Sequence, residues 1–135
     1  MQKKLLHVGI AVKNLDESVD LFSKLLGITP HGTEIVEEQK VKIAFFHIQG
    51  ASIEMTEATA PTSPIAKFIE NRGEGVHHLS FEVDDIRSEL KRLKEAGFHL
   101  IDEEPRVGAE GYWIAFIHPK STNGVLVEMS QKMQS

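Results

Sequence analysis

The sequence has no cysteine among its 135 residues. This absence excludes disulfide bonds, thiolate metal ligands and a cysteine nucleophile. It also lacks a long apolar run, because the stretch after Lys3 and Lys4 is too short for a signal peptide or a membrane span. The net charge of −5 argues against nucleic acid or an anionic membrane as a partner. We therefore expect a cytoplasmic protein that binds neither.

An internal repeat organises the chain. The strand-like segment that begins at His78 repeats the pattern of the segment that begins at His7. Glu128 follows Glu54 at a slightly larger offset than the one that separates these histidines, and a longer hairpin over 119–124 accounts for the difference. We expect one domain over 1–135, which contains module one (1–57), a connector (58–75) and module two (76–135).

Hydrophobic periodicity predicts the same order of elements, βαβββ, in each module. An apolar stripe from Leu15 to Leu26 predicts a helix that begins after Asn14 and ends at Gly27, and Ser63-Pro64 begins a short connector helix. The second module has its helix at 86–96. The predicted strands cover 5–12, 33–38, 41–48, 52–56, 78–83, 98–103, 112–118 and 125–129. The fold class is α+β, with two tandem βαβββ modules forming a curved, mostly antiparallel sheet.

Four polar residues lie on the strand face opposite the apolar face, and they would converge if the modules pair into one curved sheet. They are His7, Glu54, His78 and Glu128. Imidazole and carboxylate together suit a divalent first-row metal such as Zn, Co, Mn, Ni or Fe. Their neighbours on this face are mostly small, which leaves room for a substrate.

Two alternatives stay open at this point. One face of an antiparallel sheet is often exposed to solvent, where polar residues need no function. A second histidine pair, His47 and His118, has the same offset as His7 and His78, and we expect its members to be turn residues or pocket rim. We expect His31 and His99 in solvated loops. Alternation places His77 on the apolar side, where it is partly buried.

Local segments make the sequence similar to a known family. These segments are His7–Val12, Ser63–Ile69, Gly73–His78, Glu104–Ala109, Phe116–Ser121 and Gly124–Glu128. The paired modules resemble the vicinal oxygen chelate superfamily, which has the glyoxalase fold, and the segments closely resemble the methylmalonyl-CoA epimerases within it. The resemblance covers nearly the whole chain.

The resemblance implies an isomerase that interconverts (R)- and (S)-methylmalonyl-CoA by proton abstraction at C2 through a metal-stabilised enolate. It implies one divalent ion (Co, Zn, Mn or Ni) held by His7, Glu54, His78 and Glu128. It also implies a small-molecule acyl-CoA substrate, and we expect a homodimer. The alternatives are another metal-dependent glyoxalase-type isomerase or dioxygenase, and a non-enzymatic small-molecule binding protein.

Inversion at C2 requires a proton carrier on each face of the planar enolate. Glu128 is a candidate for one face. Some family members use a second glutamate on the third strand of module one, but Ile43 stands at the matching position. Either Glu54 or a water molecule then acts instead, or the activity differs. Lys120 is a candidate contact for a substrate carboxylate or phosphate.

Overall fold

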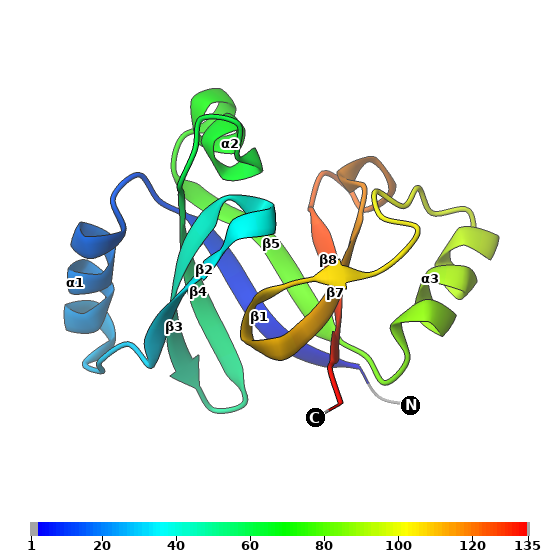
Figure 1. Ribbon diagram of the computed structural model, residues 1–135, viewed down its shortest axis with the longest axis horizontal. Helices are drawn as coiled ribbons and strands as arrows, with labels where there is room; N and C mark the ends of the chain where they lie inside the picture. Colours follow the sequence, from blue (N-terminus) through cyan, green and yellow to red (C-terminus); the bar gives the residue numbers. More distant parts are fainter. Residues whose placement is uncertain (1–2, 135) are drawn as a thin grey trace. The chain divides into compact units, whose positions relative to one another are not determined.

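The computed structural model (Figure 1) describes residues 3–134 of the chain. The chain divides into two compact units. One unit is the continuous segment His7–His77, and the other combines the N-terminal residues up to Leu6 with the chain from His78 onward. Within residues 3–134, no helix is long and apolar enough to cross a membrane.

The first unit contains a four-stranded sheet with the order β2-β3-β4-β1. The β1 strand pairs with β4 in parallel, whereas the β2–β3 and β3–β4 pairs are antiparallel. Its elements are β1 (Lys4–Ala11) from His7 onward, α1 (Leu15–Leu26), β2 (Gly32–Val36), β3 (Val41–Ile48), β4 (Ala51–Ala58) and α2 (Pro64–Arg72). The predicted βαβββ order is confirmed.

Helix α1 has the limits that the sequence predicts. The Asn14 side chain accepts a hydrogen bond from the Glu17 N–H at 3.0 Å, which satisfies one of the free donors of the first turn. Gly27 ends the helix with a φ of 70°, a left-handed conformation that glycine adopts without steric cost. The helix packs on β3 and β4. The apolar cluster beneath it contains Val12, Leu15, Ala44, Phe46 and Met55.

The second unit repeats this design with the order β5-β8-β7-β6. The β5 and β8 strands pair in parallel, and the other two pairs are antiparallel. Its elements are β5 (Gly75–Glu82) from His78 onward, α3 (Ile86–Glu95), β6 (Arg106–Val107), β7 (Tyr112–Ile117) and β8 (Val127–Lys132). Helix α3 packs on β7 and β8 over a cluster that includes Leu90, Leu93, Ala115, Ile117 and Met129. The α+β class with mostly antiparallel pairing is confirmed.

The predicted strand over 98–103 is wrong. This segment forms only an isolated bridge between Leu100 and Ile117, and the N–H groups of Ile101 and Asp102 both donate to the Phe116 carbonyl. Two donors that share one acceptor cannot continue a regular ladder. The strand that pairs with β7 begins later, as the two-residue β6. Some other strand limits differ from the prediction by a few residues. For example, β2 ends at Val36 and β8 begins at Val127.

Candidate metal-binding and catalytic site

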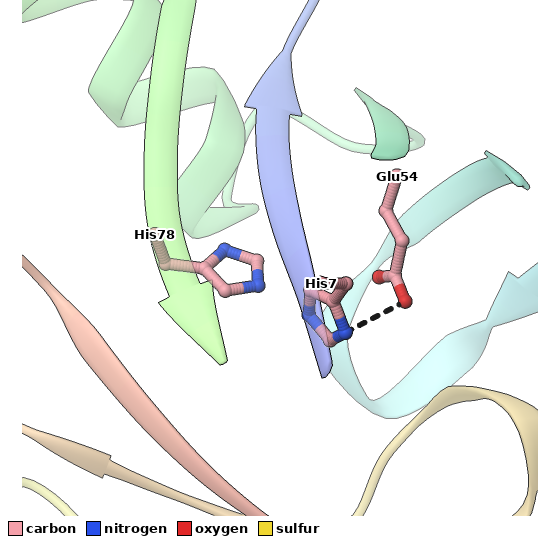
Figure 2. A group of neighbouring side chains, drawn as sticks. All are labelled: His7, Glu54 and His78. Atoms are coloured by element: carbon pink, nitrogen blue, oxygen red, sulfur yellow. Dashed lines mark ion pairs between the residues drawn. The ribbon is translucent and has the colours of Figure 1, made fainter. Parts of the chain in front are cut away.

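The first unit brings together a histidine from β1 and a glutamate from β4. Gly9 pairs with Glu54 in the parallel ladder, so His7, two residues earlier on β1, lies on the same face as that carboxylate. The His7 Nδ1 and Glu54 Oε2 atoms are 2.9 Å apart. Figure 2 marks this ion pair with a dashed line. Both residues are buried and belong to a group of side chains that could hold a metal ion.

The geometry of this pair suits neighbouring ligands of one metal ion. Two ligands at about 2.1 Å from an octahedral ion lie about 3.0 Å apart at right angles. The observed separation of 2.9 Å is compatible with that value, and it is also the length of a direct hydrogen bond between the two groups. An imidazole nitrogen and a carboxylate oxygen are also the donor types that borderline divalent ions prefer. Without a metal the two groups form an ion pair when His7 is protonated.

The second unit also holds a histidine and a glutamate, on β5 and β8. The His78 ring contacts the Phe116 ring edge to face, with centroids 5.7 Å apart and an interplanar angle of 87°. The Glu128 Oε1 atom accepts a hydrogen bond from the Ser130 hydroxyl at 3.1 Å. The Ser130 oxygen lies 2.7 Å from the oxygen of Ser80.

Burial distinguishes these four residues from an ordinary solvated sheet face. His7 and Glu54 are each 6% exposed, His78 is 8% exposed and Glu128 is 4% exposed. Charged or titratable groups are rarely buried unless they are paired or coordinate a metal. The alternative of an exposed polar face is therefore wrong for both units.

The other histidines play different parts. The His47 ring stacks on His31 with centroids 4.1 Å apart, and the His118 ring stacks on His99 at 4.8 Å. His31 and His99 are exposed, as predicted for loop residues. His77 is half-buried and contacts the Phe68 ring of α2 edge to face at 4.9 Å. This confirms its partly buried position on the apolar side.

Lys120 lies in the short turn that follows β7, and it is exposed. Its backbone N–H donates to Nδ1 of His118 at 3.0 Å, so His118 is a turn residue as predicted. The proposed contact of Lys120 with substrate stays a prediction.

Sequence reasoning missed Glu34. This residue pairs with Ile43 across the β2–β3 ladder, and Ile43 in turn pairs with Thr56 on β4. Directly paired residues lie on the same face, so the half-buried Glu34 shares a face with Glu54. Alternation within the predicted strand over 33–38 could have suggested a face for Glu34. Only the register identifies it as the neighbour of Ile43.

Residues 6–116 match the family described as the Glyoxalase/Bleomycin resistance protein/Dioxygenase superfamily. The chain belongs to this superfamily. The resemblance to methylmalonyl-CoA epimerases is confirmed by similar proteins that carry this name.

Three of these similar proteins cover nearly all of the chain. The mitochondrial methylmalonyl-CoA epimerase of Dictyostelium discoideum is 39% identical over 96% of this chain and 78% of its own. The ethylmalonyl-CoA/methylmalonyl-CoA epimerase of Cereibacter sphaeroides is 37% identical over 95% and 97%. A solved structure of a methylmalonyl-CoA epimerase in complex with methylmalonyl-CoA and NH4+ has a TM-score of 0.94, with 31% identity over 98% of this chain and 96% of that one.

Proposed function

We propose that the protein interconverts (R)- and (S)-methylmalonyl-CoA by removing and returning the proton at C2. The observation that carries this proposal is the buried set of two histidines and two glutamates at repeat-equivalent positions, in a chain related to proteins of that name. The structure of a relative that is described as a complex with methylmalonyl-CoA supports the acyl-CoA class of substrate.

A divalent metal ion is the cofactor of the proposal. Members of this superfamily generally bind one, and His7 and Glu54 have the spacing of neighbouring ligands. We propose His7, Glu54, His78 and Glu128 as the ligands, and Co, Zn, Mn or Ni as the ion. Such an ion, when bound, stabilises negative charge that develops on a thioester oxygen, which lets a carboxylate remove a weakly acidic proton.

The residues of the chain supply binding and proton transfer. Glu128 is buried, and its carboxylate can accept the C2 proton and return it. A second carrier is needed on the opposite face of the planar intermediate. Glu54 or water was expected from the sequence, and the register adds Glu34 as a third candidate. Lys120 is proposed to contact a carboxylate or phosphate of the substrate.

The test is hydrogen exchange at C2. Protein loaded with Co²⁺ or Zn²⁺ is incubated with one epimer of methylmalonyl-CoA in deuterated water, and the product is analysed by mass spectrometry and NMR. We expect deuterium at C2 together with the appearance of the opposite epimer. Absence of both with fully loaded protein would contradict the proposal. The expected homodimer and cytoplasmic location stay predictions, which sedimentation analysis and cell fractionation test.

A further inference from the structure

Two buried serines connect to the Glu128 carboxylate in the second unit. Ser80 and Ser130 are each 0% exposed, and their oxygens are 2.7 Å apart. The Ser130 hydroxyl donates to Glu128 Oε1 at 3.1 Å. The three side chains therefore form a continuous hydrogen-bonded chain that ends at a carboxylate oxygen.

The chemistry of the groups sets the direction of this chain. An ionised carboxylate can only accept hydrogen bonds, and a serine hydroxyl has one proton to donate. Because Ser130 gives its proton to Glu128, the proton between the two serines must come from Ser80. The Ser80 hydroxyl thus fixes the direction in which the Ser130 hydroxyl points, and the Ser130 hydroxyl fixes the orientation of the Glu128 carboxylate.

Strand pairing builds this arrangement into the backbone. In the parallel β5–β8 ladder Ser80 is the partner of Glu128, and Ser130 follows Glu128 by two positions on the same face. Since both serines are sealed from bulk water, solvent does not readily replace a lost hydroxyl. Removal of either one leaves a buried polar group without its partner.

The repeat does not supply the same pair of serines in the first unit. Gly9 is the repeat counterpart of Ser80, just as His7 is that of His78, and it has no side chain to donate. Thr56 is the counterpart of Ser130, since each follows its glutamate by two positions, and it is also buried. Glu54 is instead held directly at 2.9 Å by His7. The serine chain is therefore a feature of the second unit that the repeat does not require.

We propose that Ser80 and Ser130 are positioning residues that orient Glu128 for metal binding and proton transfer. This inference rests on the proposed function, because that function makes Glu128 a metal ligand and a proton carrier. Partners of this kind, which hold a metal-binding carboxylate in place, typically contribute about 10- to 100-fold in metal affinity or activity.

The test compares Ser130→Ala, Ser80→Ala and the double variant with Thr56→Val, a control that removes a buried hydroxyl at the equivalent position of the first unit. Co²⁺ affinity is measured by calorimetry, coordination by visible absorption, and C2 exchange by kcat and KM. We expect Ser130→Ala to weaken Co²⁺ binding and lower kcat by about 10- to 100-fold with little change in KM. Ser80→Ala should have a smaller effect, and Thr56→Val almost none.

The double variant distinguishes two possibilities. Either Ser80 acts on Glu128 only through Ser130, an arrangement called a relay below, or each serine has a separate packing role. In a relay Ser80 acts only through Ser130, so the double variant should match Ser130→Ala in Co²⁺ affinity and kcat. The inference would be overturned if the losses in Co²⁺ affinity and kcat of the two single variants added in the double variant. It would also be overturned if Ser130→Ala had the same affinity and kcat as Thr56→Val. If Ser130→Ala does not fold, a Ser80→Ala protein with unaltered affinity, absorption and kcat would overturn it equally. If the wild-type protein neither binds Co²⁺ nor catalyses hydrogen exchange at C2, the proposed function is overturned, and the role of the two serines with it.

Discussion

In the first unit the Glu54 carboxylate lies directly against His7, whereas in the second unit the Glu128 carboxylate is held through two serines. Both glutamates are buried and both come from repeat-equivalent strands. The difference shows that a duplicated scaffold can keep the position of a side chain and change what holds it. In the first unit the Glu54 carboxylate lies against an imidazole, which is a charged partner only when it is protonated. In the second unit the Ser130 hydroxyl fixes the direction of the Glu128 Oε1 atom, which suits a proton carrier.

The largest expected effect comes from replacing each glutamate by glutamine, which tests whether Glu54 and Glu128 have different roles. Both changes remove one negative charge and keep an amide oxygen that can coordinate a metal, but an amide cannot accept the C2 proton. We expect Glu128→Gln to retain weakened metal binding and to lose about 10²–10⁴-fold in C2 exchange. Glu54→Gln should lose about tenfold or less at saturating metal, if Glu54 is chiefly a ligand.

Exchange rates at several Co²⁺ concentrations separate lost binding from lost proton transfer. Equal damage from the two substitutions at saturating metal would contradict the assignment and would make Glu54 a proton carrier. Glu34→Gln is the companion measurement, because Glu34 lies beside Ile43 on the same face. A loss comparable to that of Glu128→Gln would identify Glu34 as the second carrier.

The two adjacent histidines of β5 offer a second test. His78 is buried against Phe116, whereas His77 lies on the other face against Phe68. We expect His78→Ala to weaken Co²⁺ binding by more than about 100-fold. His77→Ala should leave metal content unchanged and lower the free energy of unfolding by about 1 kcal/mol, through the lost aromatic contact.

Metal content by elemental analysis and urea unfolding of the metal-free proteins give the two readouts separately. If both alanine variants lost the metal equally without a loss of stability, the strand-face assignment would be wrong.

The smallest expected effect concerns the helices. Glu89 of α3 is buried and pairs with Arg92 and Lys3, both at 2.9 Å, whereas its counterpart in α1 is Ser18. The hydrogen bond from Arg92, with help from Lys3, holds the pKa of Glu89 below its ordinary value of 4.5, against the opposing effect of burial. Because the folded-state pKa is depressed, this contribution to stability is present above pH 4.5 and is lost as the pH falls through the folded-state value.

We therefore expect Glu89→Gln to lower the free energy of unfolding by about 1–2 kcal/mol at pH 7, and by progressively less below pH 4.5. Urea unfolding between pH 7 and pH 3 measures this difference. Ser18→Ala is the control, whose difference from wild type should not depend on pH. If the free energy of unfolding of Glu89→Gln differed from that of wild type by the same amount at every pH between 7 and 3, the assigned role of the ion pairs would be wrong.

Most of the local structure could be predicted from the sequence, because it depends on neighbours in the chain. The limits of α1 follow from the Asn14 cap and from Gly27, and β3 has the predicted bounds of Val41–Ile48. The failure at 98–103 has a non-local cause. Whether that segment is a strand depends on the partner groups of Phe116, which its own alternation does not contain.

The site was only partly predictable for the same reason. Alternation places residues on a face but does not say whether that face is covered, so the burial of His7 and Glu128 could not be read from the pattern. The bond between Ser80 and Ser130 depends on the β5–β8 register, which the sequence does not determine. Ser80 could be recognised from the sequence only as a small neighbour.

The division of the chain has a practical consequence for handling the protein. The residues up to Leu6 belong with the segment from His78 onward, although the repeat places them at the start of module one. Lys3 pairs with Glu89 at 2.9 Å, and Lys4 lies 3.9 Å from Glu82. An affinity tag fused next to Lys3 and Lys4, or a protease that removes these residues, would therefore act first on their ion pairs with α3 and β5. Loss of Co²⁺ binding in a tagged preparation should be checked against an untagged one before it is attributed to the ligands.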